Sequence, residues 1–212
     1  MAIKLIAVAL IAYLIGNINP AIIIGKIMHV DIRKEGSGNA GMTNTIRVIG
    51  LWAGILVLIV DVFKAFFAVK LGILITDDLL GGIAAFAAVV IGHCYPAIFS
   101  FKGGKGVAAS LGAAFALNWP SALAVLIVAA VIFLISGRRM SLASIGAAAA
   151  YPAFVYYFVP DIRCLYFAIA AALFLVIKHG SNISRLARGE EESLKIGNKD
   201  KSTNADSEGG TK

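Results

Sequence analysis

Most of this chain consists of apolar runs long enough to cross a lipid bilayer, and this feature restricts its fold more than any other. A spanning helix needs roughly 20 mainly apolar residues. Hydrophobic residues make up 59% of the 212 residues and charged residues 15%. Backbone groups in lipid must be hydrogen-bonded within their own segment, so these runs are expected to be helices. The sequence therefore predicts an all-α polytopic membrane protein and excludes an ordinary soluble enzyme, a disordered protein and a disulfide-built secreted module.

Seven apolar segments can be delimited. They cover about residues 3–28, 48–75, 79–99, 107–117, 121–136, 141–159 and 162–177. The first is interrupted near Pro20 and is interpreted as a retained span rather than a signal peptide. The fourth and fifth are separated by the turn signal Asn118-Trp119-Pro120. These two segments could instead form one broken span, which would give six spans.

The distribution of Lys and Arg favours seven spans. With seven, the loops at 26–47, 100–106 and 137–140 share one side with the chain from Lys178, and this side holds 15 of the 19 basic residues. With six, the later loops change sides and the asymmetry largely disappears. The positive-inside rule makes the basic side cytoplasmic. We therefore expect seven transmembrane helices, an external N-terminus and a cytoplasmic C-terminus, and we attribute the net charge of +7 to this topology rather than to nucleic-acid binding.

The chain leaves no room for a separate extramembrane domain. Residues 1–190 are expected to form a single transmembrane domain, and the polar residues 191–212 a disordered C-terminal tail. Cys94 and Cys164 lie in apolar runs and are interpreted as small packing residues.

Two glycine-rich loops on the predicted cytoplasmic side have the composition of phosphate-binding loops. Residues 36–44 (GSGNAGMTN) combine three glycines with hydroxyl and amide side chains, and Arg47 follows. Residues 101–106 (FKGGKG) combine glycines with Lys102 and Lys105. Backbone N–H groups, positive side chains and a following helix N-terminus all favour a bound anion. The alternatives are a flexible polar loop for the first segment and a positive-inside anchor for the second.

Other polar groups lie near the same face. His93 ends the third apolar segment and could be a packed side chain, a general base or an anion ligand. Ser141 opens the sixth segment and could act as an N-cap. His179 and Asn182, three residues apart, share a face if the last helix continues. The three histidines do not pair with Cys, Asp or Glu at ligand spacing, so no metal site is expected.

Asp61 and Lys64 are the exception, because they lie inside the second apolar segment. Charges in the membrane are costly, so the two side chains are expected to face the bundle and pair, either as a structural ion pair or in transport or catalysis. All other polar clusters lie on one face, which suits an enzyme acting on phosphorylated small molecules at the membrane surface. A transporter or channel for a phosphorylated solute is the main alternative, supported by the intramembrane Asp61–Lys64 pair and by broken helices.

The motifs resemble those of the bacterial integral-membrane acyl-phosphate:glycerol-3-phosphate acyltransferases, the PlsY family. The resemblance covers roughly residues 5–190, and GSGNxGxTN followed by HxxPxxFxFKGGKGVA is its most specific part. It implies a seven-helix bundle with a cytoplasmic active site in a bacterial cell (inner) membrane. It also implies transfer of a fatty acyl group from acyl phosphate to the 1-hydroxyl of sn-glycerol 3-phosphate, giving lysophosphatidate and phosphate, the first acylation of phospholipid biosynthesis.

The resemblance also implies roles for individual residues. The donor phosphate would be bound by Ser37, Gly38, Asn39, Thr43 and Asn44, and glycerol phosphate by Arg47, Lys105, Ser141, His179 and Asn182. The catalytic residues would be His93, Ser141 and Lys105. Met42 stands where the family usually has alanine, and Asn17 and Asn19 replace usual residues of its first span.

An acyl phosphate is already an activated mixed anhydride, so no cofactor, ATP, coenzyme A or covalent serine is expected. Neutralising two anions and positioning them would supply most of the catalysis. His93, His179 and a phosphate oxygen of the donor remain candidates for the general base. The expected partners are the two substrates, membrane lipid and the enzyme that makes acyl phosphate. An enzyme using acyl-carrier protein or coenzyme A, and a non-catalytic partner that delivers acyl phosphate, are further alternatives.

Overall fold

The computed structural model describes residues 1–194, and this part of the chain contains helices and loops but no strand. The predicted all-α fold is therefore confirmed. Residues 195–212, most of the predicted tail, lie outside the described residues. The helices are α1 (Ala2–Asn17), α2 (Pro20–Ile27), α3 (Met42–Val48), α4 (Leu51–Thr76), α5 (Leu79–Cys94), the 3-10 turn η1 (Ala97–Phe99), α6 (Val107–Leu117), α7 (Trp119–Ile135), α8 (Met140–Phe158), α9 (Ile162–Lys178) and α10 (Gly180–Ala187).

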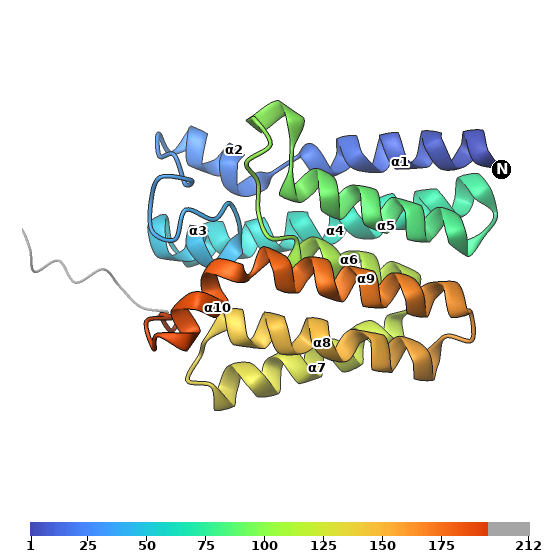
Figure 1. Cartoon of the computed structure of the whole chain (residues 1–212). Helices are drawn as coiled ribbons and strands as arrows, with labels where there is room; N and C mark the ends of the chain where they lie inside the picture. Colours follow the sequence, from blue (N-terminus) through green and yellow to red (C-terminus); the bar gives the residue numbers. More distant parts are fainter. Residues whose placement is uncertain (195–212) are drawn as a thin grey trace, which may run out of the picture.

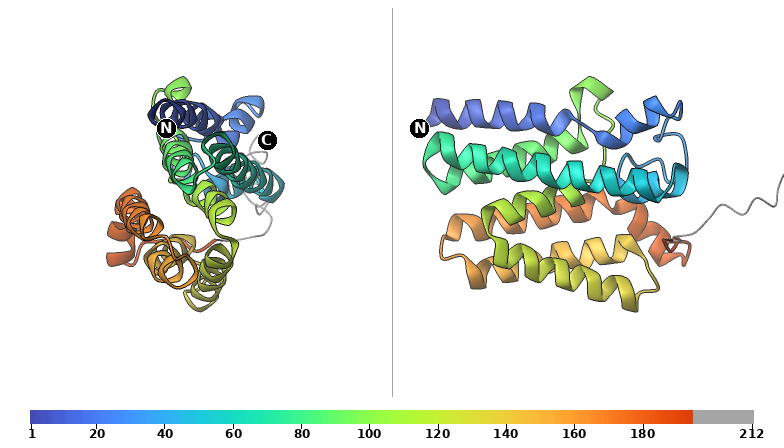
Figure 2. Two further views of the ribbon diagram at one scale, coloured as in Figure 1. Left: turned by 90° about the vertical axis from the view of Figure 1, so that its right-hand side faces the viewer. Right: turned by 180° about the vertical axis from the view of Figure 1, so that it is seen from behind.

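The long helices lie side by side in two groups (Figures 1 and 2). In the first group α5 packs against α1 and α4, and α6 packs against α4. In the second group α8 lies between α7 and α9. The end-on view in Figure 2 separates the two groups, and α6 lies nearest the second. The loops at the ends of this bundle bring together residues that are far apart in the sequence.

Helices α1 and α5 approach closely because each has a glycine at the contact. A Cβ atom on Gly16 would collide with the Val89 carbonyl of α5, and one on Gly92 would collide with the Tyr13 carbonyl of α1. Small residues at such contacts let helix backbones pack directly in membrane proteins. This contact sets α1 beside the end of α5, where His93 lies.

Within residues 1–194, three helical stretches are long and apolar enough to cross a membrane: Ala2–Ile27, Leu51–Thr76 and Leu79–Phe99. A fourth passes the same test when α9 and α10, bent by 60°, are taken together. Helices α6 and α7 are shorter apolar helices. They run in opposite directions, with the turn at Asn118, so they do not form one broken span (Figure 1). Seven spans and the orientation of the termini stay predictions.

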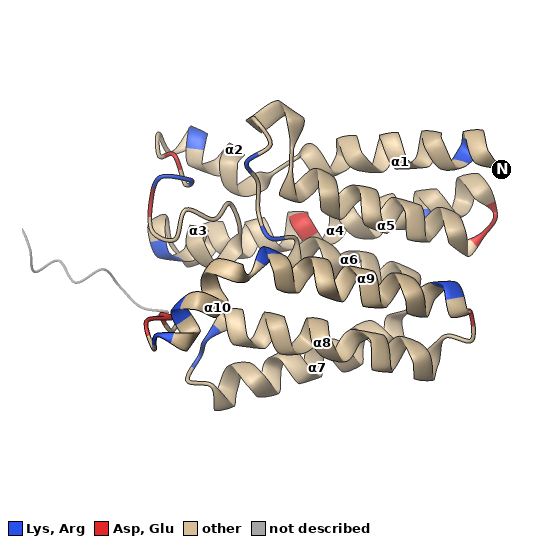
Figure 3. Cartoon of the chain, viewed as in Figure 1, with Lys and Arg blue, Asp and Glu red and all other residues tan. Residues whose placement is uncertain are grey.

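The outer surface of the bundle is apolar, as expected of a protein surrounded by lipid. Large exposed side chains occur along several helices, and Ile3, Leu74, Ile135 and Tyr157 are each at least 78% exposed. Figure 3 shows most Lys and Arg at the end of the bundle that carries α2, α3 and α10. The basic loops that the charge count grouped together therefore do lie at one end of the molecule.

The first span is broken between α1 and α2, and the buried Lys64 donates hydrogen bonds to two carbonyl groups that the break leaves without helical partners. Pro20 has no N–H group, so the carbonyl of Gly16 lacks its usual helical partner. The N–H of Ile22 donates to the side chain of Asn19 instead of the Ile18 carbonyl. Lys64 Nζ donates to both of these carbonyls, at 3.3 Å from Gly16 O and 2.5 Å from Ile18 O.

Lys64 is in turn paired with Asp61. Its Nζ lies 2.7 Å from Asp61 Oδ1, and both side chains are buried. The pair predicted from their spacing is therefore present. It also performs a task that the spacing did not reveal, because it supplies the donor that the broken helix needs.

Replacing Lys64 by methionine should destabilise the protein by about 3–5 kcal/mol, the cost of leaving one member of a buried ion pair alone. Thermal unfolding in detergent would measure this loss. Lys70→Met is the matched control, because Lys70 lies on the same helix but is exposed. Equal melting temperatures for the two variants would contradict this account of Lys64. Adding Asp61→Asn to Lys64→Met should recover part of the lost stability, because the unpaired charge is removed.

Candidate active site

The first glycine-rich loop is fastened by the side chain of Asn44. Its amide nitrogen donates to the carbonyls of Ile32 and Glu35, each at 3.0 Å, and its oxygen accepts from the N–H of Ser37 at 2.8 Å. Gly36 and Gly38 have φ of +56° and +70°, which permits this tight path. Asn44 is 1% exposed. The Asn44 side chain therefore forms its hydrogen bonds with backbone groups of the loop and fixes the loop conformation.

The loop leads into α3, which has only seven residues. The sequence predicted that a helix N-terminus after this loop would help to bind an anion. Because α3 is short and α4 begins separately at Leu51, the dipole at this N-terminus is weaker than that prediction assumed. The last turn of α3 carries Arg47.

The second glycine-rich loop folds back onto the end of α5. The N–H of Gly103 donates to the carbonyl of Cys94, and the N–H of Gly104 to that of His93, each at 3.2 Å. A Cβ atom on Gly104 would collide with the His93 ring and with the Ala40 carbonyl of the first loop. The two loops therefore meet at Gly104, beside the His93 ring, as expected if they serve one site.

His93 also belongs to the buried ion cluster. Its Nδ1 lies 3.2 Å from Asp61 Oδ1 and 3.1 Å from Lys64 Nζ. The sequence suggested that Asp61 and Lys64 stand apart from the other polar clusters, and this was wrong. The ion pair fixes the ring of His93, whose opposite edge faces Gly104 and the glycine-rich loops.

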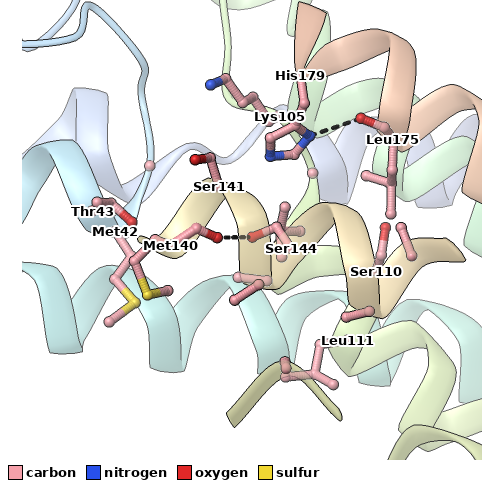
Figure 4. Close-up of a pocket in the computed structure, with 18 of the residues that line it drawn as sticks. Met42, Thr43, Lys105, Ser110, Leu111, Met140, Ser141, Ser144, Leu175 and His179 are labelled. Atoms are coloured by element: carbon pink, nitrogen blue, oxygen red, sulfur yellow. Dashed lines mark hydrogen bonds between the residues drawn. The ribbon is translucent and has the colours of Figure 1, made fainter. Parts of the chain in front are cut away.

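Residues from α8, α9 and α10 complete the opposite wall (Figure 4). His179, at the junction of α9 and α10, places Nδ1 2.7 Å from the Leu175 carbonyl. A carbonyl can only accept, so Nδ1 carries a proton and Nε2 of the neutral ring is free to accept. Lys105 donates to Asn182 Oδ1. The buried hydroxyl of Ser141 lies in the same wall and interacts with the Glu191 carboxylate.

The acidic residues that follow α10 contact polar side chains of this wall. Glu191 accepts from Asn182 Nδ2 at 2.6 Å and from Arg185 Nε at 2.7 Å. Glu192 Oε2 lies 3.5 Å from Arg47 Nε. Glu191 and Leu194 are buried, so the first residues of the predicted tail pack against the domain. Sequence reasoning missed Glu191, and its signal was the run of three glutamates at residues 190–192, shortly after the last helix.

A cavity of about 410 Å³ joins these groups, a volume typical of ligand pockets. Its polar end includes all the predicted site residues except Gly38, which is not in the lining. Its apolar end continues between helices, and its lining there includes Phe86, Leu111, Val125, Phe133 and Tyr151. Met42 also lines the cavity, beside Met140 (Figure 4). The arrangement suits a ligand with an anionic head and a long apolar part.

The pKa of Lys105 is strongly shifted at the polar end. Burial lowers its pKa to about 8, and the charges of Arg185, Lys178 and Arg47 act in the same direction. Glu191 opposes them and favours the protonated form. Lys105 and its three cationic neighbours can attract an anionic ligand, and the carboxylates of Glu191 and Glu192 partly balance their charge.

Comparison with known proteins agrees with this geometry. The sequence profile of the glycerol-3-phosphate acyltransferase family matches residues 6–189. The chain is similar to glycerol-3-phosphate acyltransferases of Prochlorococcus marinus (strain MIT 9215), at 38% identity over 86% of this chain and 94% of that protein, and of Endomicrobium trichonymphae, at 39% over 92% and 98%.

It also resembles the crystal structure of PlsY (YgiH), described as an integral membrane glycerol 3-phosphate acyltransferase in its glycerol 3-phosphate form. The TM-score is 0.84 and the identity 36%, covering 90% of this chain and 96% of that one. The family match, the sequence identity and the similarity of fold show that the chain belongs to the family of integral membrane glycerol-3-phosphate acyltransferases, the PlsY family.

Proposed function

We propose that the enzyme transfers a fatty acyl group from acyl phosphate to the 1-hydroxyl of sn-glycerol 3-phosphate, releasing lysophosphatidate and phosphate. The observation that carries the proposal is the cavity in which polar groups, among them Lys105, Arg47 and Ser141, adjoin an apolar space between helices. The acyl chain lies among the apolar side chains, and its phosphate lies beside the first glycine-rich loop. The acyl carbonyl is then at the boundary, where the two loops meet His93.

The polar residues of the cavity form two groups, one for each substrate phosphate. Ser37, Asn39 and Thr43 line the cavity on the side of the first loop and bind the donor phosphate. Gly38 and Asn44 act indirectly, because Gly38 lies outside the lining and the Asn44 side chain holds the loop. Glycerol phosphate binds on the other side, at Arg47, Lys105, Ser141, His179 and Asn182. The Ser141 hydroxyl, which lines the cavity, and the free Nε2 of His179 suit the hydrogen bonds of this substrate.

In the reaction, the 1-hydroxyl oxygen attacks the acyl carbon and the bond from this carbon to the phosphate oxygen breaks. The hydroxyl proton ends on the departing phosphate, so atoms and charge balance without a covalent enzyme intermediate. His179 Nε2, His93 and the phosphate oxygen itself are the groups able to take that proton first. Lys105 and Arg47 offset the repulsion between the two phosphates, which otherwise opposes their approach.

We further propose that the protein has seven spans in a bacterial inner membrane and that the cavity opens to the cytoplasm. The gathering of basic loops at one end of the bundle supports this orientation. A separate cytoplasmic enzyme would supply the acyl phosphate.

The donor assignment is tested with purified protein in liposomes, given palmitoyl phosphate and glycerol 3-phosphate, with palmitoyl-coenzyme A as a parallel donor. Lysophosphatidate and phosphate should form from palmitoyl phosphate alone. Lys105→Ala should reduce the rate by about 100-fold, because a positive group at the reacting phosphates is lost. Lys102→Ala is the control, since Lys102 lies exposed in the same loop. Product from the coenzyme A donor alone, or uptake of glycerol 3-phosphate without product, would refute the proposal.

The rate should depend on the charge of Lys105. Because its pKa is about 8, kcat/KM for glycerol 3-phosphate should fall as the pH rises through about 8. Arginine stays protonated in this range, so Lys105→Arg should retain some activity and lose the alkaline limb. An unchanged alkaline limb in Lys105→Arg would assign it to another group.

Gly104→Ala tests whether the reaction needs both loops in contact with His93. The added Cβ would force apart the His93 ring and the Ala40 carbonyl, and a displacement of this kind costs about 100-fold in kcat. Gly180→Ala is the matched control, because a Cβ there meets nothing within 4 Å. If both variants turn over like the wild type, the contact between the loops has no role in catalysis.

A further inference from the structure

Glu191 is a buried carboxylate that lines the cavity, and the reaction proposed above gives it no role. Its side chain is 6% exposed, and it follows α10 in a segment held at several points. The N–H of Glu190 donates to the Arg185 carbonyl at 2.8 Å, and that of Leu194 to the Arg138 carbonyl at 2.9 Å. This segment is therefore tied both to α10 and to the loop before α8, and Glu191 is held in place rather than resting on the surface.

The hydrogen bonds of Glu191 determine which way the Asn182 amide faces. An ionised carboxylate can only accept, so Asn182 must turn its NH₂ group toward Glu191. Its oxygen then faces Lys105 and accepts from the ammonium group. In the opposite orientation, the NH₂ group would face the Lys105 ammonium, and two donors would oppose each other. The second oxygen of Glu191 holds Arg185, which keeps the carboxylate itself in one orientation.

Glu191 also balances positive charge at the polar end. Lys105 faces Arg47 of α3, Lys178 of α9, His179 at the α9–α10 junction, Arg185 of α10 and Glu191. Burial tends to raise the pKa of Glu191, but its polar neighbours Ser141, Asn182 and Arg185 lower it below the usual value. The carboxylate is therefore charged at neutral pH and helps to keep Lys105 protonated.

We propose that Glu191 is a positioning residue for glycerol 3-phosphate, which acts through Asn182 to hold the Lys105 ammonium where the substrate phosphate binds. This inference rests on the proposed function. Glu191 is thus distinct from the neighbouring Glu192, whose side chain is 75% exposed beside Arg47 and can move aside when phosphate arrives.

Glu191→Gln is the direct test. The neutral amide cannot accept from both Asn182 and Arg185, so the KM for glycerol 3-phosphate should rise about tenfold, the value of one hydrogen bond to a charged group. The KM for palmitoyl phosphate should change less than about twofold, because the donor loop is not involved. The alkaline limb of kcat/KM should shift to lower pH, since Lys105 loses a negative neighbour. Glu190→Gln, which breaks an exposed pair with Arg188, is the matched control.

A double-mutant cycle separates positioning from a merely structural role. Glu191 acts through Asn182, so Glu191→Gln in an Asn182→Ala background should raise the KM for glycerol 3-phosphate little further. Fully additive effects, or equal increases in both KM values, would overturn the proposal. Glu191→Asp serves if the glutamine variant does not fold. It keeps the charge, so the alkaline limb should stay while the KM for glycerol 3-phosphate rises, and an unchanged KM would again overturn the proposal.

The two hypotheses fail in different ways. If wild-type protein makes no product from acyl phosphate and glycerol 3-phosphate, the proposed function itself is wrong. If the wild type is active and Glu191→Gln matches Glu190→Gln in both KM values and in its pH profile, the function stands and the role of Glu191 is wrong.

Discussion

The ammonium group of Lys64 links the break in the first span to the centre of the site. It bonds the two carbonyls that Pro20 and the Asn19 cap leave without helical partners. Its partner Asp61 also contacts His93, whose ring packs against Gly104 of the second glycine-rich loop. An uncompensated charge or carbonyl here would cost several kcal/mol in a medium without water. The same cluster thus satisfies a broken helix and fixes the group around which the loops are built.

The site combines two environments that a membrane-embedded enzyme already contains, the apolar space between its helices and the polar loops at its end. The spaces between apolar helices continue the character of the surrounding lipid, so an acyl chain enters them with little change in its solvation. The loops at the basic end carry N–H groups and cations, which are the groups that a phosphate-binding site needs. The cavity lies where these environments meet, and Lys105, Ser141 and His179 come to it from separate parts of the chain. In the reaction that we propose, the reactive carbonyl lies at this boundary.

The sequence was sufficient for the helical segments, the pairing of Asp61 with Lys64 and the convergence of the polar motifs. It was insufficient where a residue's role depends on a partner distant in the chain. Asn44 looked like a phosphate ligand, yet its amide holds a loop. Glu191 looked like part of a solvated tail, because nothing local shows that Asn182 and Arg185 surround it. Polar residues in glycine-rich loops are ambiguous in this way, since the same hydrogen-bonding groups can bind a ligand or the backbone.

The dependence of the first span on Lys64 has a consequence for biosynthesis. Ile18 leaves the ribosome 46 residues before the side chain that bonds its carbonyl. During that interval, the broken segment has unbonded carbonyl groups that lipid cannot satisfy. The nascent N-terminal helix must therefore stay near the aqueous interior of the insertion machinery, or near the water interface, until α4 has been made. The two segments are best regarded as one unit of membrane insertion, released into the bilayer together.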